Sequence, residues 1–338
     1  ILSYKRFLLS IFIIMNSNVK ETFTENKPDL VEIIRLYAPE SVLRSGSWIK
    51  DYGECKNAGK ELVSSCKHQL GLDAQAFFLR CPVDRPKWPA FLAIDGATME
   101  AKVPAHAHDV HGPIESFGTL LIRYADLSVA NDGWEKMNSS GVVNRLLGPD
   151  SALASVRIER LRMLQVKEII SNPQLFVKNL NPDRTYLLHA YTYPPCLNVD
   201  GSPKDANTAQ YVNFIAHRFV PGFEKYTGCN VEAFWLRGAE SGFNEQFTSS
   251  EAITSNGDAY RNVPSDKPPA SFWITTWDDE KHCEEANDRF FNDPEFVNNL
   301  INDNPYSRTI KNKDGKDIFM PVYEYERIVQ EMTNLILP

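Results

Sequence analysis

The stretch from Ser271 to Leu300, SFWITTWDDEKHCEEANDRFFNDPEFVNNL, decides the fold. It opens with an aromatic and β-branched run, Phe272–Trp277, which predicts a β-strand. Asp278 and Asp279 follow, and carboxylates suit a helix N-terminus because they accept from its unpaired N–H groups and meet the positive end of its dipole. The polar helix predicted next is interrupted near Pro294, which can begin a further helical turn.

The composition is that of a folded protein. The chain has 338 residues, of which 43% are hydrophobic and 11% aromatic, so it can bury cores in two domains of ordinary size. The formal charge of −8 argues against a broad electrostatic surface for nucleic acid, and we expect no nucleic-acid partner. The six cysteines are scattered without a CxxC pair, which favours free core thiols over a disulfide framework.

Residues 1–44 are predicted to be an N-terminal extension. A charged Tyr4-Lys5-Arg6 and the apolar run 7–14 have the features of a signal peptide, but Met15 is a plausible start. We interpret residues 1–14 as translated upstream sequence, with a signal or anchor segment and an ordinary helix as alternatives. The run is too short to span a bilayer. The expected location is the cytoplasm, or outside the cell if residues 1–14 are a genuine signal.

A first folded unit is predicted over residues 45–170, after a weakly helical segment at 30–36. Its expected elements are a helix at 55–70, strands at 76–80, 88–94 and 118–124, and a helix leading to Leu147. The stretch 155–166 is either a closing strand or an amphipathic segment.

A second unit is predicted over residues 180–338. Its expected elements are a strand at 185–193, a helix at 208–226, a strand at 231–237, the strand and helix of the opening stretch, and a last strand at 318–329. The intervening residues 238–269 predict a long surface excursion. This order is β-α-β-β-α-β. The first unit has a similar but less clear order, which indicates an internal duplication. In it, residues 120–147 correspond to residues 272–300, and Asp126 corresponds to Asp278.

The strand, acidic cap and helix of the opening stretch resemble the second half of a ferredoxin-like repeat in the dimeric α/β-barrel superfamily. The NIPSNAP and EthD-like branches are the most similar, and Pro86-Lys87-Trp88 resembles a segment of EthD-like proteins. The resemblance implies an α+β fold of tandem ferredoxin-like βαββαβ repeats packed as a dimeric α/β-barrel. It also implies a small hydrophobic or aromatic ligand, and a homodimer is a further expectation.

For function, the EthD-like resemblance implies a cofactor-independent enzyme that acts on a small aromatic or polyketide-like molecule. His189 is one candidate acid or base, because strand periodicity places it on the face of the strand that also carries Leu187, Tyr191 and Tyr193. The alternative for His189 is a hydrogen-bonded core histidine. We expect no cofactor.

His217 is the second candidate acid or base. It follows an aromatic stripe in AQYVNFIAHRFVPGF, similar to an aromatic–Glu-His-x-Pro helix in EthD-like proteins, but Ala216 stands where that pattern has an acidic residue. The NIPSNAP pattern, which requires no histidine there, fits about as well. The residues expected to contact the substrate are Tyr191, Tyr211, Trp235, Trp273 and Trp277, although aromatic strand residues are more often plain core.

Two further interpretations complete the predictions. His106, His108 and His111 lie within six residues and could ligate a metal ion, although a His-rich polar loop is the preferred interpretation. The alternative function is a non-enzymatic NIPSNAP-like small-molecule-binding or adaptor protein whose pocket is filled by core side chains. No P-loop, Gly-x-Gly-x-x-Gly or Gly-x-Ser-x-Gly motif is present, so nucleotide chemistry and serine hydrolysis have no support.

Overall fold

The computed structural model describes residues 30–37, 50–82, 116–148, 151–153, 157–169, 177–191, 195–239, 247–248, 271–293, 304–305, 308–311, 317–320 and 328–337. The first half contains β1 (Leu30–Tyr37), α4 (Tyr52–Ser64), the π-helical segment η1 (Ser65–Gln69), β2 (Asp73–Arg80), β3 (Gly118–Tyr124), α6 (Leu127–Ser139), α7 (Val142–Leu147) and β4 (Arg157–Gln165).

The second half contains β5 (Thr185–Tyr191), α8 (Ala206–Phe214), the π-helical segment η2 (Ile215–Phe219), α9 (Val220–Thr227), β6 (Asn230–Arg237), β8 (Ser271–Trp277), α10 (Glu280–Asn292) and β11 (Ile328–Ile336). A short strand β7 (Phe247–Thr248) adds to β4, and β9 (Arg308–Lys311) pairs with β10 (Asp317–Met320) in a separate hairpin.

Within the described residues, the main sheet has nine strands in the order β1-β3-β2-β11-β5-β8-β6-β4-β7, and β1 also pairs with β4. Every strand except β7 therefore has a neighbour on both sides, and the sheet closes on itself. All the pairs around the ring are antiparallel. The fold is α+β, with an antiparallel sheet as its centre.

The register of the strands matches between the two halves. β2 has a bulge between Ala74 and Ala76 where it pairs with β3, and β6 has a bulge between Val231 and Ala233 where it pairs with β8. The order is β4-β1-β3-β2 in the first half and β11-β5-β8-β6 in the second.

The two junctions between the halves also match. Thr333 of β11 lies opposite Arg80 of β2, and Met163 of β4 lies opposite Arg237 of β6. These pairings occupy the same positions relative to each half's own bulges and strand ends. The closed sheet therefore has an approximate two-fold relation between its halves.

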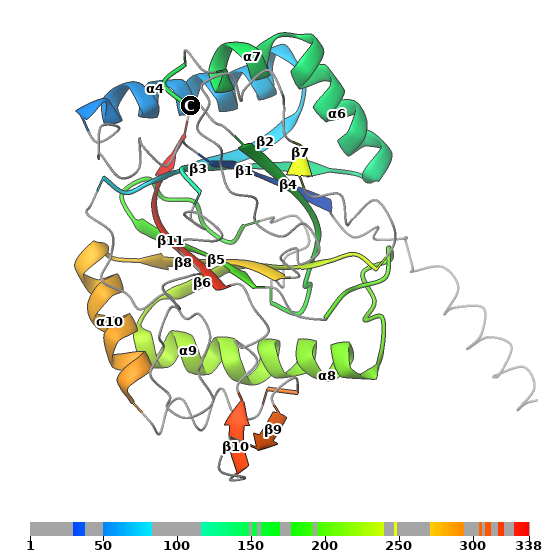
Figure 1. Ribbon diagram of the computed structural model, residues 1–338, viewed down its shortest axis with the longest axis vertical. Helices are drawn as coiled ribbons and strands as arrows, with labels where there is room; N and C mark the ends of the chain where they lie inside the picture. Colours follow the sequence, from blue (N-terminus) through cyan, green and yellow to red (C-terminus); the bar gives the residue numbers. More distant parts are fainter. Residues whose placement is uncertain are drawn as a thin grey trace, which may run out of the picture.

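The helices form two layers outside the sheet (Figure 1). α4, α6 and α7 lie against the strands of the first half, and α8, α9 and α10 lie against those of the second half. Successive strand residues face opposite ways. Phe77 faces α4, where its ring approaches Gly59, whereas Phe78 faces inward and packs edge-on against Tyr186 of the other half at 5.2 Å between ring centroids.

An ion pair in the interior of the closed sheet has both of its side chains fully buried. Arg35 Nη1 lies 2.9 Å from Glu159 Oε2, and the two residues are opposite each other in the β1–β4 register. Such a pair contributes little net stability because of the cost of desolvation, but removing one partner leaves a buried charge uncompensated. It therefore selects this register over its neighbours.

Two sequence-based expectations about secondary structure were wrong, and a third is not tested. Residues 30–36, expected to be weakly helical, form β1, because Val31, Ile33 and Ile34 are β-branched and pack on both faces of a strand. The closing strand begins at Ile328, and residues 318–320 belong instead to β10. The strand expected at 88–94 lies outside the described residues.

The strand and the helix predicted at the start of the stretch Ser271–Leu300 are confirmed. Residues 272–277 lie in β8 and the helix that follows is α10, which ends at Asn292 before Pro294. The N-cap is Asp279, whose Oδ1 accepts from the backbone N–H of His282 at 2.7 Å. In the first half Asp126 caps α6 in the same way, so its counterpart is Asp279 rather than the expected Asp278.

None of the helices in the described part of the chain is both long and apolar enough to cross a bilayer.

We predict that Asp279→Ala lowers the free energy of unfolding by about 1 kcal/mol, because the N–H of His282 loses its acceptor. Asp279→Asn retains a capping oxygen and is expected to stay within a few tenths of a kcal/mol of the wild type. Urea unfolding of the three proteins at one pH measures the difference. Equal losses in both variants would contradict the capping role.

Candidate functional site

His189 is a buried titratable group between the strands of the second half and the helices that cover them. It lies on β5 with 1% of its surface exposed. Its ring stacks on Trp273 of β8, with 3.8 Å between centroids and 16° between planes. The two residues are opposite each other in the β5–β8 register, so the strand pairing itself sets the stack.

Thr275 is the centre of the hydrogen-bond network around this imidazole. Its Oγ1 lies 3.1 Å from His189 Nε2, accepts from Trp277 Nε1 at 2.8 Å, and donates to the carbonyl of Leu187 at 3.4 Å. A hydroxyl has one proton to donate and two lone pairs. With that proton on the Leu187 carbonyl, all contacts are satisfied when His189 carries its own proton on Nε2.

Burial lowers the pKa of His189 well below its usual value, because the charged form would lose its hydration in this layer. The imidazole is therefore neutral at physiological pH. A neutral imidazole retains a basic nitrogen and can accept a proton.

Aromatic rings from the covering helices pack around the stack. Phe219 and Phe223 meet Trp273 edge-on with centroids 5.7 and 5.5 Å away, and Phe234 of β6 lies 6.0 Å from it. Tyr211 extends the group through its contact with Phe234 at 6.5 Å. Phe219 is only partly buried and is thus the point where this aromatic layer meets solvent.

The structure separates the two predicted catalytic histidines. His189 is buried in the aromatic layer, whereas His217 is exposed, although Phe214 and Ile215 shortly before it are buried. His217 does lie in η2, and π-helical turns are frequent at functional sites. It does not contribute its side chain to the buried network.

The predicted substrate-contacting residues do not all lie in the aromatic layer. Trp273, Trp277 and Tyr211 lie in the aromatic layer, but Trp235 belongs to the other face of β6 and packs against Phe272 at 6.1 Å. Tyr191 lies at the end of β5 opposite Ser271. The loop with His106, His108 and His111 lies outside the described residues.

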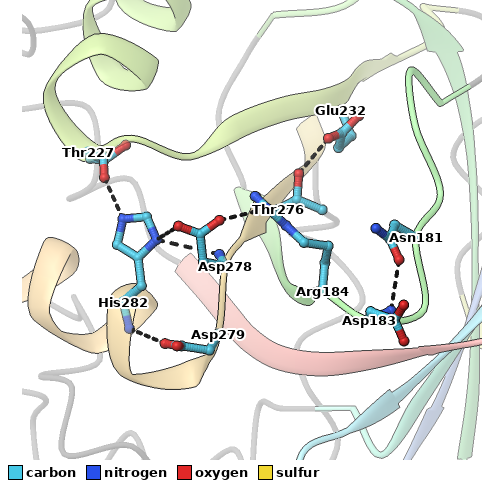
Figure 2. Close-up of polar contacts among 9 residues, drawn as sticks. All are labelled: Asn181, Asp183, Arg184, Thr227, Glu232, Thr276, Asp278, Asp279 and His282. Atoms are coloured by element: carbon cyan, nitrogen blue, oxygen red, sulfur yellow. Dashed lines mark hydrogen bonds and ion pairs between the residues drawn. The ribbon is translucent and has the colours of Figure 1, made fainter.

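Sequence reasoning missed a third histidine, His282 of α10 (Figure 2). Its Nε2 is 2.9 Å from the carbonyl oxygen of Thr227, and its Nδ1 is 3.4 Å from Asp278 Oδ2. Asp278 in turn pairs with Arg184 at 2.6 Å. We call Arg184, Asp278, His282 and the Thr227 carbonyl the polar clamp. The ring of His282 also packs edge-on against Trp277 at 5.4 Å between centroids, and Trp277 donates to Thr275 in the His189 network.

The signal for this clamp was present in the sequence. Asp278 and His282 are four residues apart across a helix N-terminus, a spacing that places side chains side by side. His282 contacts the C-terminus of α9 through the Thr227 carbonyl, and the next residue, Gly228, ends that helix in the left-handed conformation at φ 78°. It therefore fixes α10 against α9 and holds Trp277 in place.

Glu232 occupies the bulge of β6. The hydroxyl of Thr276 donates to its Oε1, and the backbone N–H of Asn179 donates to its Oε2 at 2.8 Å. Burial raises the pKa of this carboxyl, and these hydrogen bonds partly oppose the rise. The carboxyl is thus fully engaged in structural bonds.

Comparisons with known proteins do not assign this chain to a family. No family model matches the chain, and no curated protein matches it. Among solved structures it is similar to a presumed monooxygenase from Lactobacillus acidophilus NCFM, with 11% identity, a TM-score of 0.36 and coverage of 91% of this chain and 94% of that one. An anthrone oxidase-like protein has 10% identity, a TM-score of 0.41 and coverage of 92% of both chains. Likeness at this level carries no conclusion about chemistry.

We predict that His189 makes the stability of the protein fall with pH below about 6.5. Its pKa is lower in the folded than in the unfolded state, so the unfolded chain binds the extra proton. The stabilisation is fully present above the unfolded pKa and is lost as the pH falls below it, by up to about 1.4 kcal/mol per pH unit.

His189→Phe keeps a ring on Trp273 but removes the titration, so its free energy of unfolding should change less between pH 7.5 and 5.5 than that of the wild type. Urea unfolding at several pH values measures this difference. The exposed His217→Gln serves as the matched control and should follow the wild type. Parallel pH profiles for wild type and His189→Phe would contradict the prediction.

Proposed function

We propose that the chain consists of two ferredoxin-like repeats, residues 30–170 and 180–338, that form in one polypeptide the barrel of the dimeric α/β-barrel superfamily. The support is the matched strand order, the matched bulges and the matched junctions of the two halves. The first repeat begins with β1 and not at residue 45, because β1 lies between β3 and β4.

For function, we propose cofactor-independent acid–base chemistry on a small aromatic molecule, with His189 as the acid or base. The observation that carries the proposal is a neutral imidazole stacked on Trp273 with its Nε2 at Thr275. Thr275 orients the ring and sets the tautomer. The imidazole then takes a proton from a phenolic or enolisable substrate: the O–H or C–H bond breaks, and an N–H bond forms.

The aromatic layer is suited to such a substrate. Trp273, Phe223 and Phe234 offer ring faces and edges to a flat molecule, and they exclude water from the imidazole. The partly exposed Phe219 lies in a π-helical turn, and displacement of its ring would admit a ligand to Trp273. Product release would reverse the same movement.

A second candidate function has an observation of its own. The rings of the layer already contact one another and His217 is exposed, as expected for a non-enzymatic small-molecule-binding or adaptor protein whose pocket is filled by core side chains. In that case the His189–Thr275 bond is a satisfied core contact.

A ligand screen by thermal shift tests the proposal, with a panel of aromatic acids, phenols and quinones against wild type, His189→Phe and Phe219→Ala. Any ligand that stabilises is then incubated with the protein, and products are measured by mass spectrometry. We expect an aromatic ligand to raise the melting temperature of the wild type, with tighter binding to Phe219→Ala because the entry is open.

His189→Phe should still bind the ligand, because the ring stack remains, but should form no product. His217→Gln is the matched control and should behave as the wild type in binding and turnover. Binding without turnover in every variant would make the adaptor function the better one. Turnover retained in His189→Phe would exclude His189 as the acid or base.

A further inference from the structure

Trp277, the last residue of β8, makes the shortest of the three side-chain contacts of Thr275. Its Nε1 donates to Thr275 Oγ1 at 2.8 Å, whereas His189 Nε2 lies 3.1 Å and the Leu187 carbonyl 3.4 Å from that oxygen. Trp277 is fully buried, so water does not compete for its donor. An indole N–H can only donate, and the contact therefore takes one lone pair of the Thr275 hydroxyl whatever the state of His189.

The indole leaves only two directions open at Thr275. A hydroxyl oxygen has one O–H bond and two lone pairs besides its own carbon. With one lone pair on the indole, the proton points to the Leu187 carbonyl, which only accepts, and the other lone pair points to His189 Nε2. Without the indole N–H, one direction is empty, and the hydroxyl can turn toward it. The contact with His189 then has no fixed polarity.

The indole ring is itself held by two helices. Phe223 of α9 packs edge-on against it, with 6.3 Å between centroids and 87° between planes, and His282 of α10 does so at 5.4 Å and 79°. His282 is fixed in turn, because its Nε2 lies 2.9 Å from the Thr227 carbonyl. These contacts restrict the rotamers of the indole, so the direction of its N–H is set by the fold.

The first half shows that the fold does not require this chain of hydrogen bonds. Tyr124 corresponds to Trp277, because each ends its strand two residues before the aspartate that caps the next helix. The residue two positions earlier is Thr275 in the second half and Ile122 in the first. The first half therefore has an apolar side chain in place of the hydroxyl.

The histidine is replaced as well. His189 lies opposite Trp273 in the second half, and the corresponding pair in the first half is Ile34 opposite Leu120. The second half thus differs from the first at all three members of the chain: the indole donor, the hydroxyl and the imidazole. This joint difference indicates that the three side chains act as a unit.

We propose that Trp277 is a positioning residue for His189: its indole N–H holds the Thr275 hydroxyl so that the imidazole carries its proton on Nε2. The inference rests on the proposed function, in which His189 is the acid or base. An imidazole accepts a proton only on the nitrogen that lacks one, so a fixed tautomer keeps the same nitrogen basic in every molecule. Trp277 therefore supports the imidazole through Thr275 and acts without touching the substrate.

The tautomer of His189 can be measured from the ¹⁵N chemical shifts of the imidazole in protein labelled with ¹⁵N-histidine, at pH 7.5. The spectrum of His189→Phe identifies its signals among those of the seven histidines. We expect the Nε2–H form to predominate in the wild type. In Trp277→Phe, which keeps an aromatic ring but removes the donor, the ratio of the Nε2–H to the Nδ1–H form should fall about fivefold, the value of one net hydrogen bond.

Three further variants separate this role from a loss of packing. Trp235→Phe removes an equally buried indole from the other face of β6 and should leave the tautomer ratio of His189 unchanged. Thr275→Val removes the hydroxyl at nearly constant shape and should lower the ratio as Trp277→Phe does. The double variant Trp277→Phe/Thr275→Val should show no further change, because Trp277 acts through Thr275.

A closer substitution keeps the test valid if Trp277→Phe does not fold. Benzothienylalanine at position 277 has sulfur in place of the indole N–H and nearly the same shape, so it should lower the ratio without the loss of packing. Circular dichroism and thermal melts confirm that each protein is folded.

An unchanged tautomer ratio in the folded variants at position 277 would overturn the proposal. An equal change in Trp235→Phe would also overturn it, because the effect would then be general to lost packing. Turnover of any substrate that the ligand screen identifies should fall in Trp277→Phe by about the same factor, with binding unchanged. Absence of turnover in the wild type would count against the proposed function alone, since the tautomer ratio still decides the role of Trp277.

Discussion

The structure depends on the backbone pairing of its two halves along two seams, β2 with β11 and β4 with β6. A four-stranded half alone would present two edge strands with unpaired N–H and C=O groups, which is costly when buried and prone to aggregation when exposed. Each seam pairs one such edge with an edge of the other half. Closure of the ring then gives every strand of the barrel a fixed neighbour, and thereby a fixed face toward the helices.

This constraint explains why local sequence patterns predicted much of the fold. The pattern is strong in the opening stretch, where residues 272–277 are aromatic and β-branched and Asp279 follows directly as a helix cap. The pattern was misleading at 30–36, because Glu32 and Arg35 interrupt an apolar run at a helical interval. Their charges are matched by partners on β4, more than a hundred residues away, which no local pattern reveals.

The same reasoning applies to the candidate site. Strand periodicity predicted the face of the strand on which His189 lies, and in the structure Trp273 of the neighbouring strand stacks on its ring. It could not decide that Trp235 faces the opposite way, because the bulge in β6 shifts the register by one residue. It also missed His282, whose role depends on a carbonyl at the end of another helix.

The position of β11 in the chain has a consequence for biosynthesis. β11 is the last of the described strands along the chain, yet it lies between β5 of its own half and β2 of the other. On the ribosome, the first four strands are complete long before residues 328–336 emerge, so one seam can form while the other waits until β11 has been translated. Contacts of such long sequence separation form slowly. During that interval the exposed edge of β2 is a natural place for a chaperone to bind.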